Sequence, residues 1–373
     1  MAHVHLVEPF FGGSHRVWAE GWRDHSRHRI ELDTLEARAW RWRMRGGAIT
    51  LAGRLLERDP AYRPDVIVAS DMLDLATFAA MIRRRLPDVP IVAYLHENQL
   101  TYPRQPGEPL DQGLAWTTWR SLVVADRIWC NSQFHLDEVV AAVADLLGSV
   151  PDHPHDALLD EVAARMEVMP VGVDLGWVGT SPRRLEGAAL SPLVVSNQRW
   201  HHDKDVGAVV RELRRLARGG VDFRVAVVGD HEGGEALHID PVLDDLGARV
   251  VARGHLGRDA YRRLLREADI VVSAAHNEFF GIAVVEALAA GCVPVLPRRL
   301  AYPETVPAEF HEGALYDSGD LEPALRTAIT DVDQRRRSVV GLAEAMRRFD
   351  WAVLAPRYDD AIDRLAVAGP AGR

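Results

Sequence analysis

Two stretches in the second half of the chain carry side chains that suit a nucleotide sugar. Residues 196–206 read Ser-Asn-Gln-Arg-Trp-His-His-Asp-Lys-Asp-Val and supply two cations, Arg199 and Lys204. Residues 278–286 read Glu-Phe-Phe-Gly-Ile-Ala-Val-Val-Glu and supply two carboxylates, Glu278 and Glu286. Cations and the free amides of a helix start bind a diphosphate, whereas carboxylates bind the hydroxyls of ribose and hexose. The two stretches together predict glycosyl transfer.

The spacing of the two carboxylates predicts where each lies. The apolar run 282–290 is typical of a helix, which places Glu286 inside the helix and Glu278 in the loop before it. The two side chains can then hold two ends of an elongated ligand, while the amides of Gly281 and Ile282 face its phosphates. As alternatives, Glu278 caps the helix, Glu286 is a solvated helical position, and the two cations are ordinary loop residues.

A glycine-rich turn follows the first expected strand. Residues 8–15 read Glu-Pro-Phe-Phe-Gly-Gly-Ser-His, and Gly12 with Gly13 permits a sharp turn whose amides face a ligand. The alternative is a plain connection between strand and helix, with Ser14 as the helix cap.

Hydrogen-bonding side chains are crowded in residues 94–103, which read Tyr-Leu-His-Glu-Asn-Gln-Leu-Thr-Tyr-Pro. We expect His96 to bind the donor sugar near its anomeric carbon, and Glu97 or Asn98 to contact the acceptor. Gln99 and Tyr102 are further candidates for the acceptor. The alternative is a turn whose polar groups satisfy one another.

Residues 37–47, which we call the Arg/Trp segment, read Ala-Arg-Ala-Trp-Arg-Trp-Arg-Met-Arg-Gly-Gly and contain no acid. Arginine pairs with phosphate through two hydrogen bonds and tryptophan stacks on exposed bases, so the segment suits loop or single-stranded RNA. The alternatives are a solvated face with the tryptophans packed inside, or a surface that docks on a membrane. The candidate residues for the acceptor here are Arg38, Trp40, Arg41, Trp42 and Arg43.

Composition limits the class of protein. A chain of 373 residues is long enough for two cores, and its net charge of -10 argues against indiscriminate nucleic-acid binding. The two cysteines, Cys130 and Cys292, lie in apolar segments and provide neither a disulfide framework nor a cysteine-rich zinc site. The apolar runs are too short to span a bilayer and the N-terminus lacks the pattern of a secretory signal, so we expect a cytoplasmic protein.

Short β-branched runs alternate with helix-like stretches in both halves of the chain, which predicts two doubly wound parallel sheets. We expect domains at 1–180 and 181–350, a helix over 351–373 that packs back across their junction, and a ligand site between the domains at the carboxyl ends of the strands. The expected strands are 3–7, 66–70, 91–95, 128–131 and 168–171 in the first half, and 193–196, 223–228, 248–252, 270–273 and 293–296 in the second.

The pairing of Arg199 and Lys204 with Glu278 and Glu286 resembles the signature of GT-B glycosyltransferases of family 4. This resemblance implies an α/β fold of two Rossmann-like domains that face a central cleft, and a retaining transfer from a nucleoside-diphosphate sugar. It also implies that the two cations bind the diphosphate, Glu278 lies near the donor sugar and Glu286 binds the ribose. Asp331 and Asp333 form an Asp-x-Asp pair in a late helix-like region, far from any expected strand end, so we predict a transfer without a metal ion.

Residues 8–15, 40–43 and 96–103 together resemble the tRNA-queuosine alpha-mannosyltransferase family, a branch of family 4. The resemblance implies GDP-mannose as the donor and, as the acceptor, the cyclopentenediol hydroxyl of queuosine in a tRNA anticodon loop. Two other readings stay open: a lipid or small-molecule acceptor, and a non-catalytic RNA-binding relative. We expect no cofactor and no stable membrane association.

The catalytic candidates are His96, Arg199, Lys204 and Glu278. Further donor-binding candidates are Gly12, Gly13, Phe280, Gly281, Ile282 and Glu286, and His15 joins the acceptor candidates named above.

Overall fold

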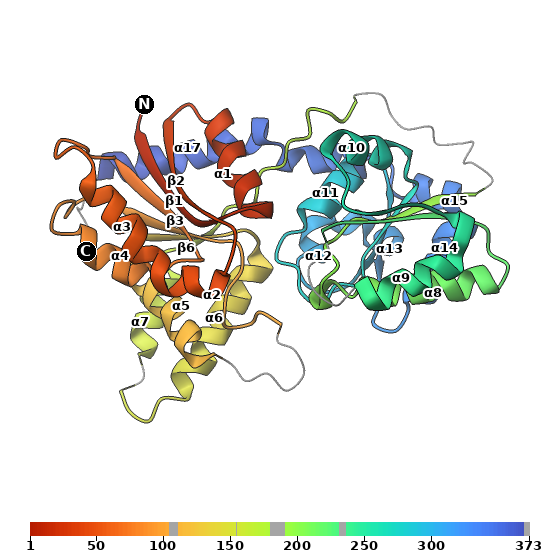
Figure 1. The fold of residues 1–373 in the computed structure, drawn as a ribbon, viewed down its shortest axis with the longest axis horizontal. Helices are drawn as coiled ribbons and strands as arrows, with labels where there is room; N and C mark the ends of the chain where they lie inside the picture. Colours follow the sequence, from red (N-terminus) through yellow and green to blue (C-terminus); the bar gives the residue numbers. More distant parts are fainter. Residues whose placement is uncertain (104–110, 154, 180–190, 231–235, 369–373) are drawn as a thin grey trace. The chain divides into compact units, whose positions relative to one another are not determined.

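The computed structural model describes residues 1–103, 111–153, 155–179, 191–230 and 236–368 (Figure 1). The chain forms two compact units, one made of Met1–Val173 with Trp351–Arg373 and the other of Asp174–Asp350. The boundary that we predicted between residues 180 and 181 lies outside the described residues and stays a prediction.

The first unit contains a six-stranded parallel sheet in the order β2-β1-β3-β4-β5-β6. Consecutive strands are joined by helical connections, as a parallel sheet requires. The strands are β1 (His3–Phe11), β2 (Arg29–Glu36), β3 (Val66–Ser70), β4 (Ile91–Leu95), β5 (Arg127–Cys130) and β6 (Met166–Val168).

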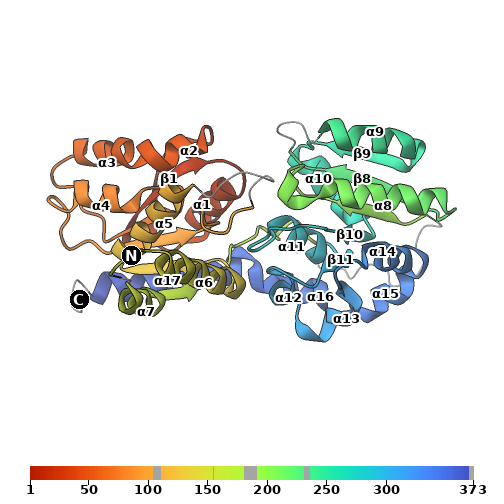
Figure 2. The ribbon, with the colours of Figure 1, turned by 90° about the horizontal axis from the view of Figure 1, so that it is seen from below.

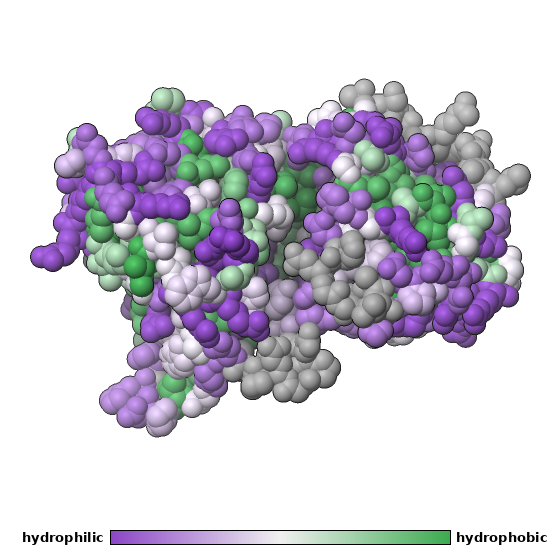
Figure 3. All heavy atoms as spheres, in the orientation of Figure 1, coloured by the Kyte–Doolittle hydropathy of each residue, from purple (hydrophilic) through white to green (hydrophobic). Residues whose placement is uncertain are grey.

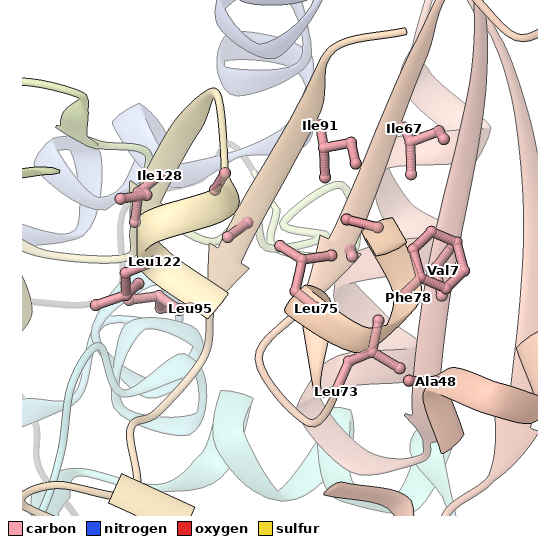
Figure 4. Packing of buried hydrophobic residues seen from close by; sticks show 14 of the residues in the cluster. Val7, Ala48, Ile67, Leu73, Leu75, Phe78, Ile91, Leu95, Leu122 and Ile128 are labelled. Atoms are coloured by element: carbon pink, nitrogen blue, oxygen red, sulfur yellow. The ribbon is translucent and has the colours of Figure 1, made fainter. Parts of the chain in front are cut away.

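Both faces of this sheet are covered by helices, which is why every residue of β3 and β4 is buried. One face packs on an apolar cluster that includes Ile67, Ile91 and Phe78, shown in Figure 4. On the other face Tyr94 stacks against Trp18, with 4.2 Å between the ring centres. The helices are α1 (Gly13–His25), α2 (Trp40–Trp42), the π-helix η1 (Arg43–Gly47), α3 (Ala48–Glu57), α4 (Leu75–Ile82), α5 (Gln112–Val124), α6 (Gln133–Gly148), α7 (Asp156–Ala163) and α17 (Trp351–Ala368).

The second unit repeats this architecture with a parallel sheet in the order β12-β11-β10-β7-β8-β9. Its strands are β7 (Leu193–Ser196), β8 (Arg224–Val228), β9 (Val250–Gly254), β10 (Ile270–Val272), β11 (Val293–Pro297) and β12 (Leu315–Tyr316).

Helices of several lengths surround the second sheet, and α8 lies beside α9 (Figure 2). The α-helices are α8 (Val206–Arg218), α9 (Ala236–Leu246), α10 (Arg258–Glu267), α11 (Ile282–Ala289), α12 (Tyr302–Thr305), α13 (His311–Ala314), α14 (Leu321–Thr330), α15 (Val332–Ser338) and α16 (Leu342–Ala345). The 3-10 turns are η2 (His202–Lys204), η3 (Gly247–Arg249), η4 (Ala308–Phe310) and η5 (Met346–Phe349).

The strand predictions were right at 66–70, 91–95 and 193–196, and most of the others differ by one or two residues. The prediction of 168–171 began two residues too late and ended three residues too late, because β6 (Met166–Val168) ends before Pro170, which has no N–H for a sheet hydrogen bond. The strands β2 and β12 were missed. β2 lies at the sheet edge and carries charged residues along its length, and β12 has only two residues.

On the visible face of each unit, hydrophilic residues surround smaller apolar patches (Figure 3). Among the described helices, none is both long enough and apolar enough to cross a membrane.

Candidate active site

Lys204 and Glu278 meet in the second unit, although they are far apart in the sequence. Lys204 lies in η2 after β7 and Glu278 lies in the loop after β10, and these two strands are neighbours in the sheet. The Nζ atom of Lys204 is 3.2 Å from Oε2 of Glu278 and donates a hydrogen bond to the backbone oxygen of Asn277 at 2.5 Å. The structure therefore brings one predicted cation and one predicted carboxylate into a single, largely buried ion pair.

Gln198 fixes the orientation of the Glu278 carboxylate, and our sequence reasoning missed it. Its Nε2 atom donates to Oε2 of Glu278 at 3.2 Å and to the hydroxyl of Tyr302 at 3.0 Å. The hydroxyl of Ser273 donates to Oε1 of Gln198 at 2.8 Å. The signal in the sequence was a polar residue two positions after a buried strand, at the edge where ligands bind in such sheets.

Asp203 provides a second negative partner for Lys204. It is buried, and its Oδ2 atom is 3.5 Å from Nζ of Lys204. Burial would raise the pKa of Asp203, but the hydrogen bond with His201 and the charges of Lys204 and Arg199 hold that pKa below its usual value. Arg199, the other predicted cation, is exposed to solvent.

The chain contains a second Asp-x-Asp pair, Asp203 and Asp205, which our sequence reasoning missed when it considered only Asp331 and Asp333. Both of its carboxylates have partners within the protein. Oδ1 of Asp203 is 2.5 Å from Nδ1 of His201. The carboxylate of Asp205 caps α8 by accepting a hydrogen bond from the amide of Ala208 at 3.1 Å.

Glu286 lies on α11, half-buried, and is not the solvated position that we considered as an alternative. Its Oε2 atom accepts a hydrogen bond from the hydroxyl of Tyr261 at 2.9 Å, and Asn197 donates to that hydroxyl at 3.0 Å. Burial raises the pKa of Glu286 to about 7, against the opposing effects of Tyr261 and of the nearby Arg258 and Arg262.

The start of α11 is formed by Gly281, whose φ of 92° favours glycine. No side chain caps this helix, so the alternative in which Glu278 is the cap is wrong. Phe280 is buried and packs edge-on against Phe349, with 5.1 Å between the ring centres. Its side chain therefore belongs to the core, and the predicted donor contacts of residues 280–282 would come mainly from the backbone.

In the first unit a buried carboxylate pairs with a buried histidine. Oε2 of Glu8 on β1 is 3.1 Å from Nδ1 of His15 on α1. Burial would lower the pKa of His15, but the Glu8 carboxylate raises it to about 9, so His15 is an imidazolium at neutral pH.

The glycines before His15 are required by the local backbone. A Cβ atom on Gly12 would lie 2.4 Å from Cβ of Ala37, and Gly13 has a φ of 52°. Gly12 occupies the N-cap position of α1, so the alternative in which Ser14 is the cap is wrong.

His96 follows β4 and lies against the same histidine. The ring centres of His96 and His15 are 4.0 Å apart, and the ring of Trp18 is 4.9 Å from that of His96. Burial first, and then the charge of His15, hold the pKa of His96 well below its usual value, so its imidazole is neutral. Its Nε2 atom is buried without a hydrogen-bond partner among the described residues. A neutral imidazole with a free nitrogen can bind a hydroxyl group.

Asp71 and Asn131 hold the backbone of His96 in place, and our sequence reasoning missed both. The Asp71 carboxylate accepts hydrogen bonds from the amides of His96 at 3.2 Å and Glu97 at 3.1 Å. The side chain of Asn131 donates to the backbone oxygen of His96 at 2.9 Å. Burial raises the pKa of Asp71 to about 7. Each of the two residues directly follows a buried strand, β3 and β5, and that position was the available signal.

The turn after His96 satisfies many of its own polar groups, as our alternative predicted. Oδ1 of Asn98 accepts hydrogen bonds from the amides of Leu100 at 3.0 Å and Thr101 at 2.9 Å. Gln99 donates to the Glu97 carboxylate at 3.3 Å. Tyr102 is half-buried at the end of this turn. The roles of these residues toward the acceptor stay predictions.

One group of possible metal ligands occurs in the part of the chain that the structure describes. It consists of Glu8, His15 and His96, whose ligand atoms lie within 4.8 Å of one another. A metal ion at this group would have to displace the proton that the ion pair with Glu8 holds on His15. Transfer without a metal ion stays our prediction.

The Arg/Trp segment contains α2 and η1, and the residue before α2, Ala39, has a left-handed backbone with φ of 51°. Trp40 packs against a small apolar cluster that contains Met44, whereas the Trp42 side chain is 65% exposed. Arg38 forms an exposed ion pair with Glu36, and Arg43 donates to the backbone oxygen of the same residue. Arg41 is exposed as well.

Comparison with known proteins identifies both halves of the chain. Residues 3–173 match the model of the tRNA-queuosine alpha-mannosyltransferase N-terminal family, and residues 191–334 match that of the glycosyl transferases group 1. The chain is 32% identical over 314 residues to the tRNA-queuosine alpha-mannosyltransferase of Drosophila melanogaster, and this match covers 82% of each protein.

Solved structures share the whole fold. The Anabaena protein HepE, in complex with UDP and glucose, superimposes with a TM-score of 0.70 at 17% identity, over 97% of this chain and 100% of that one. Sucrose-phosphate synthase from Thermosynechococcus elongatus gives a TM-score of 0.74 at 15% identity, over 99% of this chain and 100% of that one. The predicted GT-B class of two parallel α/β sheets is confirmed. The similarity to the Drosophila enzyme goes beyond the fold, and the chain is a glycosyltransferase that belongs to the tRNA-queuosine alpha-mannosyltransferase family.

Proposed function

We propose that this protein transfers mannose, with retention of configuration, from GDP-mannose to queuosine in the anticodon loop of tRNA. The observation that carries the proposal is the 32% identity to the Drosophila enzyme over 82% of each chain, because the name of that enzyme gives both the sugar and the acceptor. The proposal includes a cytoplasmic location, where tRNA is available.

The second unit would bind the donor. Loss of a diphosphate leaving group requires fixed positive groups where negative charge develops, and each such donor contributes about 2.7–4 kcal/mol in comparable oxyanion sites. Lys204, Arg199 and the amides at the start of α11 are the groups available for this purpose.

Glu278 would contact the donor sugar. Among the described residues, both hydrogen bonds to its carboxylate, from Lys204 and Gln198, go to Oε2. The other oxygen, Oε1, can therefore accept a hydrogen bond from a sugar hydroxyl. The ion pair with Lys204 and the hydrogen bond from Gln198 hold this carboxylate in one orientation before the donor arrives.

The first unit would supply His96 to the same sugar. Its neutral ring and free Nε2 atom suit a hydrogen bond to a hydroxyl near the anomeric carbon. In the proposed reaction the acceptor hydroxyl attacks from the side of the leaving diphosphate, whose oxygen takes the proton. This route requires neither a protein nucleophile nor a metal ion.

The test is incubation of the purified protein with queuosine-containing tRNA and each of several nucleotide sugars, followed by mass spectrometry of the nucleosides. The expected result is a hexose on queuosine with GDP-mannose alone, and its loss in the double variant Arg199→Ala with Lys204→Ala. A hexose from UDP-glucose but not from GDP-mannose would contradict the proposed donor. An unmodified queuosine with every donor would contradict the proposed acceptor.

A further inference from the structure

The two tryptophans of the Arg/Trp segment differ in their surroundings. Trp40 is half-buried and packs against the apolar cluster of Met44, Met72 and Leu114. The guanidinium of Arg41 lies over the Trp40 ring, 4.5 Å from its centre. The Trp42 side chain, in contrast, is 65% exposed. Packing therefore accounts for Trp40 and does not account for Trp42.

Trp42 is exposed but its ring has a defined support. Gly46 lies on the next turn, and a Cβ atom added there would be 2.9 Å from Cζ2 and 3.0 Å from Cε2 of the Trp42 ring. The six-membered ring of the indole therefore lies against the backbone of Gly46. The Cβ atom of any other residue at position 46 would occupy the space that this ring now fills. An aromatic ring that is supported on one side and exposed to solvent offers a surface for stacking, and it loses little side-chain entropy when a partner binds.

The backbone around this ring is irregular. Ala39 adopts a left-handed conformation before α2, and residues 43–47 form a π-helix instead of a regular turn. Single π-turns occur often at functional sites, and left-handed conformations of residues other than glycine are costly. These irregularities determine where Trp42 and Gly46 lie relative to each other.

The charge around Trp42 suits a polyanion. The Arg/Trp segment contains four arginines and no acid. Arg45 reaches Asp111 at 3.1 Å and Arg38 reaches Glu36 at 3.0 Å, but these pairs are exposed at the surface, where such pairs are weak. Phosphate groups can therefore compete for these guanidinium groups, since arginine binds phosphate through two hydrogen bonds.

We propose that Trp42, held by Gly46, is a stacking surface for an unpaired nucleobase of the tRNA acceptor, and that Trp40 only supports the segment. This inference rests on the proposed function, because it assumes an RNA acceptor. Loops of RNA present unstacked bases beside a dense row of phosphates, which matches one exposed aromatic ring among arginines.

The experiment measures the Kd of queuosine-containing tRNA, at one fixed salt concentration, for the full-length protein and three variants. Trp42→Ala is expected to raise Kd about 5- to 150-fold, the range that corresponds to removal of one stacking contact. Trp42→Phe keeps an aromatic ring and is expected to stay within about threefold of wild type. Gly46→Ala keeps the indole but displaces it, and is expected to weaken binding by an intermediate factor.

Ile49→Ala is the matched control, because Ile49 is an apolar side chain on α3, close in sequence, that is 57% exposed. Its tRNA affinity is expected to equal that of wild type. Thermal unfolding of each variant shows whether the fold is intact, and binding of GDP by each variant is expected to be unchanged, because the candidate donor residues of the second unit are untouched.

One result would overturn the inference: a Trp42→Ala protein whose Kd for tRNA lies within about twofold of wild type. If, in addition, both Trp42→Ala and Ile49→Ala lose binding to vesicles of phosphatidylcholine and phosphatidylserine, the segment is a membrane surface instead. These outcomes differ from failure of the proposed function, in which the wild-type protein itself leaves queuosine unmodified.

Discussion

The chemistry of Glu286 depends strongly on its surroundings. Its carboxyl group is half-buried on α11, and burial raises its pKa from 4.5 to about 7. A carboxylate accepts hydrogen bonds from two hydroxyls at once, whereas the protonated acid has lost part of that capacity. The proposed contact with the donor ribose must therefore depend on pH in the neutral range.

We predict that GDP binds more tightly as the pH rises through 7, because only then is Glu286 a carboxylate. The Glu286→Gln variant has no proton to lose, so its affinity is expected to be weaker at pH 8 and to vary less between pH 6 and 8. Isothermal titration calorimetry at several pH values measures both proteins. Identical pH profiles for the two proteins would remove Glu286 from the ribose site.

The same shift affects stability with a definite sign. The folded protein holds the Glu286 proton up to about pH 7, whereas the unfolded chain releases it near pH 4.5. Since the unfolded state binds fewer protons in this window, this group lowers the free energy of unfolding as the pH rises from 4.5 to 7. The Glu286→Gln protein lacks this decrease. The difference in free energy of unfolding, variant minus wild type, is therefore expected to increase from pH 4.5 to pH 7, and urea unfolding at each pH measures it.

At the scale of elements, the loop after β4 is held from both neighbouring strands. Asp71 after β3 binds two amides of the loop, and Asn131 after β5 binds the backbone oxygen of His96. Because the three strands are adjacent and parallel, their carboxyl ends bring these residues together. The position of His96 is thus fixed by residues that follow β3 and β5 as well as by its own turn.

We predict that Asp71→Asn lowers kcat about 10- to 100-fold, because an asparagine offers one acceptor oxygen where the carboxylate binds two amides, and a small misplacement of a reacting group is costly. GDP binding is expected to stay unchanged, since the proposed diphosphate site lies in the second unit. Asp74→Asn is the control, because Asp74 also follows β3 but caps α4 instead of contacting the loop. Equal activity of the two variants would show that Asp71 does not position His96.

Particular residues show how far the sequence predicts this arrangement. The buried strands β3, β4 and β7 and the start of α11 follow from local patterns of apolar residues and glycine, and they were predicted. Asp71, Asn131 and Gln198 act through partners on other strands, and those contacts depend on the order of strands in the sheet, which no local pattern contains. The burial of Trp40 likewise depends on Met72 and Leu114, which lie far along the chain.

At the scale of the whole molecule, the chain returns to the first unit at its end. Helix α17 packs against α1, where Trp22 donates from its indole to Oδ1 of Asp359 at 3.3 Å. The same buried carboxylate accepts hydrogen bonds from the hydroxyl of Ser26 at 2.6 Å and the amide of Arg27 at 2.8 Å. Asp359 therefore joins the last helix to the first helix and to the turn that follows it.

We predict that Asp359→Ala lowers the free energy of unfolding of the first unit by on the order of 3 kcal/mol, because three donors lose a charged acceptor. The neighbouring Asp360 is exposed and forms a surface ion pair with Arg27. Asp360→Ala is therefore expected to change the free energy of unfolding by no more than about 1 kcal/mol. Urea unfolding of both variants makes the comparison. Equal stability of the two variants would contradict the proposed role of Asp359.

The most direct measurement for the central claim is transfer of labelled mannose from GDP-mannose to two forms of one tRNA, which carry either queuosine or guanosine at the modified anticodon position. The account predicts label on the queuosine form alone, and none in the Arg199→Ala, Lys204→Ala double variant. Equal label on both tRNAs, or none on the queuosine form with the wild-type protein, would contradict it.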